Sequence, residues 1–238
     1  MTRLYLIRHG QAGPRQRYDE LSALGREQAR RLGEHFASRG IRFDEVVSGT
    51  LNRQRETALT VEEAYRGRGA LFPPIAFDPQ WDEFDWSGIY DEMSARLARD
   101  NERFRHEFER LSDSMSYEND SVHRVHHYCD IEVIRAWLEE RYPYKGETWS
   151  AFRSRVLGRL GAMPANGANS TVAVVTSATP LSIWAGHALN LDDRNVWRLA
   201  GATFNSGFSR FEAQNGRLRM ISFNETPHLD DPSLLSVR

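Results

Sequence analysis

The chain has 238 residues, 40% of them hydrophobic, which is enough for one large core or for a core with a cap. The formal net charge of -2 argues against a general nucleic-acid-binding protein, because the chain carries no overall excess of positive charge. No run approaches the ~20 apolar residues of a membrane span, so we expect no membrane partner.

The cysteine content and the first residues favour a reducing compartment. Cys129 is the single cysteine, which rules out an intramolecular disulfide. An apolar strand pattern begins almost at residue 1 and leaves no room for a signal peptide. We therefore predict a cytoplasmic protein.

Short apolar runs alternate with segments of helical periodicity, which predicts an α/β fold. We expect a three-layer sandwich with a mainly parallel central sheet. Between the first two strands, a helix begins after Ser22 and stops at Gly40. A final hairpin turns at Asn215-Gly216. The expected strands are Arg3–Ile7, Glu45–Ser48, Ile75–Phe77, Val172–Thr176, Gly207–Ala213 and Leu218–Phe223.

The segment of residues 87–144 differs from the rest of the chain. It is polar, charged and helical in pattern, with a break near residues 112–119. We predict that it is a helical lid insertion within a single domain of residues 1–238. Such a lid would select the substrate.

The tripeptide Arg8-His9-Gly10 directly follows the first apolar strand. An imidazole at the end of a buried strand can attack phosphorus as a nucleophile, and a neighbouring guanidinium offers a fork of donors to phosphoryl oxygens. Gly10 allows either a close approach of the backbone to a ligand or a positive φ.

A second anion-binding element follows the second strand. The segment Ser48–Ala58 has the pattern of a turn and a helix, with Thr50 as the N-cap and Arg53 in the first turn. Ligands of open α/β sheets bind beyond the carboxyl ends of the strands. Because His9, Ser48 and Ser177 all lie just past such ends, we expect them to converge.

A candidate general acid lies among aromatic residues in the segment Trp81–Trp86. Aromatic neighbours desolvate a carboxyl group and raise its pKa, which keeps it protonated near neutrality. Glu83 is our first candidate for this role. Asp82 and Asp85 remain alternatives, and Asp85 is the stronger of the two because it also lies between aromatic residues.

In this order, the motifs resemble those of the histidine phosphatase superfamily, also called the phosphoglycerate mutase-like family. The resemblance implies that His9 forms a transient phosphohistidine and that Arg8 and Arg53 bind the phosphoryl oxygens. It also implies that Glu83 protonates the leaving oxygen and then activates water. The matching stretches are Arg8–Gln11, Leu21–Ala29, Ser48–Ala58, Glu83, Gly146–Thr148, Phe152–Val156 and Asn224–Leu229.

One position departs from the family pattern. The family's second active-site histidine normally follows a late apolar strand, and Ser177 stands in its place here. A serine donates a neutral hydrogen bond where a histidinium donates a charged one, and losing such a donor costs roughly 2.7–4 kcal/mol. Thr179 as N-cap and Pro180 as first helical residue would leave free N–H groups that compensate in part.

These features predict a metal-independent phosphomonoesterase that needs no cofactor, acts slowly and takes a small phosphorylated substrate. One alternative is a catalytically silent protein that binds a phosphate ligand. A phosphoglycerate mutase is a weaker alternative, because residues 11–20 form a short loop without the Trp- and Asn-rich stretch of the family's mutases. The sequence leaves open whether the chain forms a homo-oligomer.

A cluster of His123, His126, His127 and Cys129 raises the question of a zinc site. On a helix, Cys129 would point away from the face that the histidines share. No second cluster supplies the matched ligands that a structural zinc site requires. We therefore predict no metal site and interpret these histidines as part of the lid helices.

Overall fold

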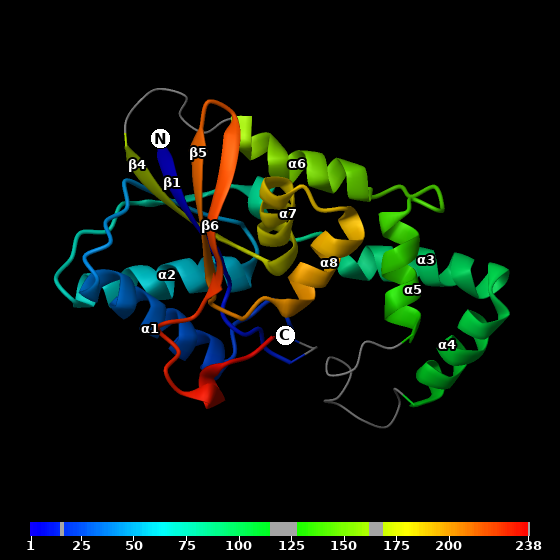
Figure 1. Ribbon diagram of the computed structural model, residues 1–238. Coiled ribbons are helices and arrows are strands. Elements are labelled where there is room, and N and C mark those ends of the chain that lie inside the picture. Colours follow the sequence, from blue (N-terminus) through cyan, green and yellow to red (C-terminus); the bar gives the residue numbers. More distant parts are fainter. Residues whose placement is uncertain (15–16, 115–127, 162–168, 238) are drawn as a thin grey trace. The chain divides into compact units, whose positions relative to one another are not determined.

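A computed structural model describes residues 1–14, 17–114, 128–161 and 169–237 of the chain (Figure 1). The chain divides into two compact units. The first combines Met1–Glu83 with Arg155–Arg238, and the second is Phe84–Ser154. All five candidate site residues belong to the first unit, so we describe that unit first.

The first unit is built on a six-stranded sheet with the strand order β3-β2-β4-β1-β5-β6. The first four of these strands are parallel to one another, while β5 runs antiparallel to β1 and β6 antiparallel to β5. The mainly parallel α/β fold predicted from the sequence is therefore confirmed. The strands are β1 (Thr2–Arg8), β2 (Glu45–Ser48), β3 (Ile75–Phe77), β4 (Ser170–Thr176), β5 (Phe208–Gln214) and β6 (Arg217–Glu225).

The turn between β5 and β6 is the predicted one. Asn215 has a φ of 51° and Gly216 a φ of 72°. Positive φ at both central residues matches the right-handed twist of a two-residue hairpin, and Asn-Gly adopts it at low cost.

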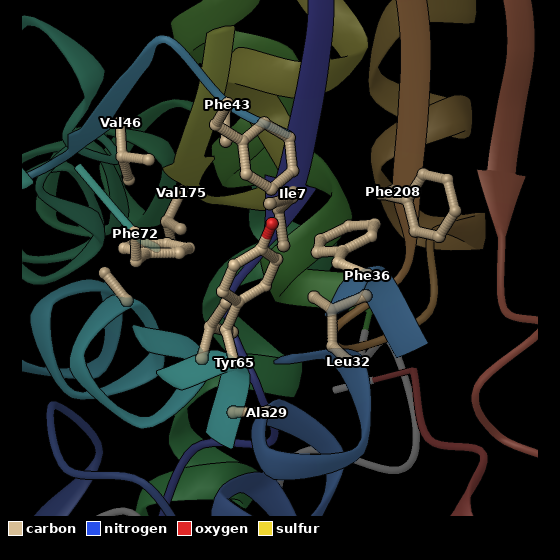
Figure 2. Packing of buried hydrophobic residues seen from close by; sticks show 13 residues of the cluster. Ile7, Ala29, Leu32, Phe36, Phe43, Val46, Tyr65, Phe72, Val175 and Phe208 are labelled. Carbon is tan, nitrogen blue, oxygen red and sulfur yellow. The ribbon is translucent and has the colours of Figure 1, made fainter. Parts of the chain in front are cut away.

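Two helices cover one face of the sheet, α1 (Ala23–Ser38) and α2 (Asn52–Gly67). Ser22 caps α1 as predicted, because its side chain accepts a hydrogen bond from the Gly25 N–H at 3.0 Å. The core beneath the helices is rich in aromatic residues, which pack mostly edge to face (Figure 2). Its members include Ile7, Leu32, Phe36, Phe43, Tyr65, Val175 and Phe208.

The opposite face of the sheet is buried by other residues of the same strands. Leu4, Leu6 and Val174 alternate with the residues of the first core, as a strand with two buried faces requires. Trp184 of α7 (Ala178–Leu189) packs there against Phe211, at 6.3 Å between ring centroids. The unit thus has helix, sheet and helix layers, and it also contains α8 (Asp193–Ala202) and the short helices η2 (Pro79–Trp81) and η3 (Pro232–Leu234).

The second unit is helical and has its own core. It contains α3 (Trp86–Asp100), α4 (Glu102–Ser114), α5 (Tyr128–Leu138) and the start of α6 (Trp149–Gly161). Trp137 packs against Phe84 at 4.7 Å and against Trp149 at 5.3 Å. The expected insertion of residues 87–144 falls inside this unit, and its role as a lid remains a prediction. Among the described helices, none is long and apolar enough to cross a membrane.

Candidate active site

Two parallel strands deliver His9 and Ser177 to the same edge of the sheet. Arg8, the last residue of β1, pairs in register with Thr176, the last residue of β4. The next residues along the two chains are His9 and Ser177, and the His9 N–H donates to the Thr176 carbonyl at 2.9 Å. Both side chains are buried. The expected convergence of these two positions is therefore observed.

The His9 ring is held in one tautomer. Its Nδ1 lies 2.7 Å from the Gly10 carbonyl oxygen. A carbonyl can only accept, so Nδ1 must carry the proton and Nε2 must carry the lone pair. The Arg53 Nε–H donates to Nε2 across 3.3 Å, which is long for such a bond. The nitrogen with nucleophilic character thus faces the Arg53 guanidinium.

The surroundings of His9 keep its ring neutral. Burial lowers the pKa of His9 well below its usual value, and the positive charges of Arg53 and Arg8 lower it further. The hydrogen bond to Gly10 opposes this shift only in part. At neutral pH the imidazole therefore keeps its lone pair, as a nucleophile requires.

Arg53 makes two contacts that fix its guanidinium. Its Nη1 donates to an Asp19 carboxylate oxygen at 2.7 Å, while its Nε faces His9. The other Asp19 oxygen accepts from the Asn52 N–H at 3.1 Å, at the N-terminus of α2. A carboxylate is favourable at that end of a helix dipole. The Asp19–Arg53 ion pair thus places a carboxylate directly beside the guanidinium.

The predicted N-cap of α2 is wrong by one residue. Leu51 is the N-cap, not Thr50. Asp82 displaces the boundary, because its carboxylate accepts from both the N–H and the hydroxyl of Thr50, each at 2.5 Å. Arg53 nevertheless lies in the first turn, as predicted.

Arg8 is buried, and Thr203 holds its guanidinium. Its Nη1 donates to the carbonyl oxygen of Thr203 and, at 3.4 Å, to the Thr203 hydroxyl. Burial lowers the pKa of Arg8, and the Tyr18 and Glu83 side chains oppose that shift. Glu83 therefore lies close enough to favour the charged form of Arg8.

The three candidate acids have different surroundings. Asp82 is occupied by Thr50, and Asp85 is the N-cap of α3, where it accepts from the Gly88 N–H at 3.1 Å. Glu83 is half-buried, and one of its oxygens accepts from the Thr179 N–H at 3.2 Å. Of the three, Glu83 is the carboxylate that acts on Arg8 and on the first turn of α7.

The start of α7 differs from the prediction. Ser177 is the N-cap and Ala178 the first helical residue, so Thr179 is not the cap. The Thr179 N–H is engaged by Glu83 and is not free for an anion. The Ser177 hydroxyl does not cap the helix either, since it accepts from Gln54 Nε2 at 2.9 Å.

Gly10 serves close packing and not a special dihedral angle. Its φ lies outside the left-handed region, but a Cβ at this position would come within 2.4 Å of the Gly25 carbonyl oxygen. The Gly10 N–H donates to Thr57 Oγ1 at 3.0 Å, and the same hydroxyl donates to the Arg53 carbonyl at 2.7 Å. Helix α2 thereby ties the loop of His9 to the backbone of Arg53.

A further histidine supports the His9 backbone. His228 Nε2 lies 2.8 Å from the Ser206 hydroxyl, and the Ser206 N–H donates to the His9 carbonyl at 3.1 Å. Burial is the main cause that lowers the pKa of His228, to about 3. No local pattern in the sequence distinguishes Ser206, Asp19 or Gln54 as a site residue. Only Thr57 carries a signal, because it lies one helical turn after Arg53.

Metal ligands do not gather in the described part of the chain, where no group of three or more His, Cys, Asp or Glu side chains could hold an ion. His123, His126 and His127 lie outside the described residues. Cys129 is buried in α5, and burial raises the pKa of its thiol to about 11.

Comparison with known families gives a match over most of the chain. The family model of the histidine phosphatase superfamily (branch 1) matches residues 4–130 and 123–226. Serine/threonine-protein phosphatase Pgam5, mitochondrial, of Caenorhabditis elegans is 28% identical over 157 residues, which are 61% of this chain and 52% of that relative. A broad-specificity phosphatase of Saccharomyces cerevisiae is 41% identical over 68 residues, which are 26% of this chain and 30% of that protein. The chain spans about half the length of the first of these relatives.

Solved structures share the fold over nearly the whole chain. Bacillus stearothermophilus YhfR has a TM-score of 0.64 at 18% identity, covering 97% of this chain and 100% of that one. A phosphoserine phosphatase from Entamoeba histolytica has a TM-score of 0.62 at 18% identity, covering 96% and 100%. At these identities the likeness shows the fold.

The Asp19–Arg53 pair yields a prediction about anion affinity. An anion at Arg53 meets the Asp19 carboxylate, which lies 2.7 Å from the same guanidinium. We expect Asp19→Asn to tighten the binding of inorganic phosphate about fivefold, because removing a like charge at a partly exposed site is worth ~1 kcal/mol. Isothermal titration at low ionic strength measures this change.

The neighbouring carboxylate supplies the control. Glu20 pairs with Arg17 at 3.8 Å on the surface, so Glu20→Gln should leave phosphate affinity unchanged. Weaker phosphate binding by Asp19→Asn would contradict the prediction and would mean that Asp19 mainly holds Arg53 in place.

Proposed function

Because the chain belongs to the histidine phosphatase superfamily, we propose that it is a phosphomonoesterase that hydrolyses a small phosphate ester through a phosphohistidine on His9. One observation carries the proposal: the Nδ1–H of His9 is bound by the Gly10 carbonyl, which leaves the lone pair on Nε2. The buried, neutral ring can attack phosphorus once the Arg53 N–H turns from Nε2 to the phosphoryl oxygens.

The first step forms a bond between His9 Nε2 and phosphorus while the bond from phosphorus to the ester oxygen breaks. Glu83 takes up a proton when the anionic ester binds beside it, and it gives that proton to the departing oxygen. In the second step Glu83 takes a proton from water as the water oxygen attacks phosphorus and the bond from phosphorus to His9 Nε2 breaks. Inorganic phosphate leaves, and His9 and protonated Glu83 are regenerated.

The positive charges of the site support this chemistry. Arg53 Nε lies 3.3 Å from His9 Nε2, so its guanidinium can bind the oxygens of a phosphoryl group on Nε2, and we assign the same role to Arg8. Ser177, at the adjacent strand end, would donate one neutral hydrogen bond. We expect slow turnover, because a serine stabilises the transferring group less than a charged donor does.

A catalytically silent phosphate-binding protein is the second candidate. Two observations favour it: the engagement of Arg53 by Asp19, and the serine at position 177. Both features reduce the stabilisation of the transition state more directly than they reduce the stability of the fold. The two candidates differ in turnover and not in phosphate binding, so turnover decides between them.

The proposal predicts slow hydrolysis of p-nitrophenyl phosphate that survives excess EDTA and is lost in His9→Ala. The loss should exceed about 10²-fold, because no other nucleophile replaces the imidazole. Release of p-nitrophenol measures the rate. His187→Ala, an exposed histidine on α7, is the matched control and should keep the parent rate.

Activity that persists in His9→Ala would refute the phosphohistidine route. A parent protein that binds inorganic phosphate but releases no p-nitrophenol would favour the silent binding protein.

The acid role of Glu83 predicts a dependence on the leaving group. Glu83→Gln should slow hydrolysis of an alkyl phosphate such as glycerol phosphate by about 10²–10⁴-fold, because an alkoxide needs the proton. The same change should lower kcat/KM for p-nitrophenyl phosphate far less, because kcat/KM reports the first step and p-nitrophenolate leaves without protonation. Steady-state kinetics on both esters test this contrast.

Asp85→Asn is the matched control for Glu83→Gln. It removes the rival carboxylate at the N-cap of α3 and should slow both esters equally or not at all. A leaving-group effect in Asp85→Asn and none in Glu83→Gln would transfer the acid role to Asp85.

A further inference from the structure

Two consecutive residues in the first turn of α2 contact the two strand ends of the site. Arg53 Nε contacts His9 Nε2 at 3.3 Å, after β1. Gln54 Nε2 contacts Ser177 Oγ at 2.9 Å, after β4. Arg53 has an expected role in phosphate binding, and Gln54 has none.

Each polar atom of the Gln54 side chain has a partner, which fixes the orientation of the amide. Nε2 donates to the Trp81 carbonyl at 3.1 Å as well as to Ser177, and Oε1 accepts from the Leu51 N–H at 3.3 Å. Because the Trp81 carbonyl can only accept, the NH₂ group must face it. Gln54 is fully buried, so water does not compete for these bonds.

This orientation determines what the Ser177 hydroxyl can do. Its oxygen accepts from the Gln54 NH₂ group, so its own hydrogen must point elsewhere. Within the described ranges of the chain, no residue accepts that hydrogen. Ser177 follows β4 as His9 follows the neighbouring β1, so its hydroxyl hydrogen can be donated to a group bound at His9.

We propose that Gln54 is a positioning residue that orients the Ser177 hydroxyl as a hydrogen-bond donor to the phosphoryl group at His9. The proposal rests on the phosphatase function proposed above. Gln54 acts through Ser177 and does not touch the substrate. The pair supplies an uncharged donor at the position where the family resemblance expects a histidine, and this donor does not titrate near neutral pH.

The same contact has a consequence for the space beside Ser177. The Gln54 amide lies at hydrogen-bond distance from the serine oxygen, and both residues are buried. A histidine ring at position 177 would extend into the volume that the amide fills. Gln54 and Ser177 are therefore matched in size, and enlarging one requires shortening the other.

A double-mutant cycle tests the coupling. Gln54→Met keeps the volume and removes the donor, and it should lower kcat/KM for p-nitrophenyl phosphate about fivefold. Ser177→Ala should lower it tenfold or more, on the order of the loss of one oxyanion donor. The double variant should match Ser177→Ala within about twofold, because Gln54 has no other route to the substrate.

Gln28 supplies a matched control from α1. It is also fully buried, accepts from the Gln11 N–H at 2.8 Å and donates to the Leu234 carbonyl at 2.7 Å. Gln28→Met should lower the thermal midpoint about as much as Gln54→Met. Gln28→Met should change kcat/KM by the same factor in the parent and in the Ser177→Ala background.

In a second test, the same Gln54 substitution should have opposite effects on kcat/KM in two backgrounds. Gln54→Ala should lower kcat/KM in the parent and raise it about tenfold in a Ser177→His background, where it makes room for the ring. The Ser177→His/Gln54→Ala protein should also gain one further ionisation near neutrality in its pH–rate profile, from the new imidazole. A merely structural role for Gln54 would lower activity in both backgrounds.

The readouts separate this inference from the phosphatase proposal. If the parent shows no turnover, the phosphatase proposal fails, and the same cycle is measured as the Kd of inorganic phosphate. The inference is upheld if Gln54→Met weakens phosphate binding in the parent but not in the Ser177→Ala background. Equal losses from Gln54→Met in both backgrounds overturn it, whether the parent is active or silent.

Discussion

The hydrogen bond between His9 Nδ1–H and the Gly10 carbonyl is the constraint on which the rest of the site depends. It fixes the tautomer and the plane of the ring, and it leaves a lone pair on Nε2. The backbone of His9 is held on both sides. Its carbonyl accepts from the Ser206 N–H, and the His9 N–H donates to the Thr176 carbonyl. A ring with the other tautomer would present N–H to an incoming phosphorus atom and could not attack it.

The charges around this ring are balanced by neighbouring side chains. Burial, with the charges of Arg53 and Arg8, lowers the pKa of His9 and keeps it neutral, and a carboxylate lies near each arginine, Asp19 near Arg53 and Glu83 near Arg8. A dianionic phosphoryl group can enter such a site because the positive charge is already placed and desolvated. The Asp19 carboxylate opposes entry of an anion at Arg53, so the site combines a His9 ring of fixed tautomer with a reduced attraction for anions.

Local sequence patterns determine the parts of the structure that were predicted. The apolar runs, the Ser22 cap and the Asn-Gly turn depend on neighbours along the chain, and the structure has them as expected. The wrong N-cap predictions at Thr50 and Thr179 share a feature. In each case a carboxylate that is distant in sequence accepts a hydrogen bond from the backbone N–H of the threonine, Asp82 at Thr50 and Glu83 at Thr179. The role of Gln54 could not be predicted either, because it depends on a contact with Ser177, which is distant in the sequence.

The most direct measurement is the identification of the phosphorylated residue during turnover. Protein mixed with p-nitrophenyl phosphate is quenched in base, where a phosphorus–nitrogen bond is stable, and its peptides are analysed by mass spectrometry. The account predicts one added phosphoryl group on the peptide that contains His9, and its loss on acid treatment. A turning-over protein with no phosphoryl group on His9, or with an acid-stable one on another residue, would contradict it.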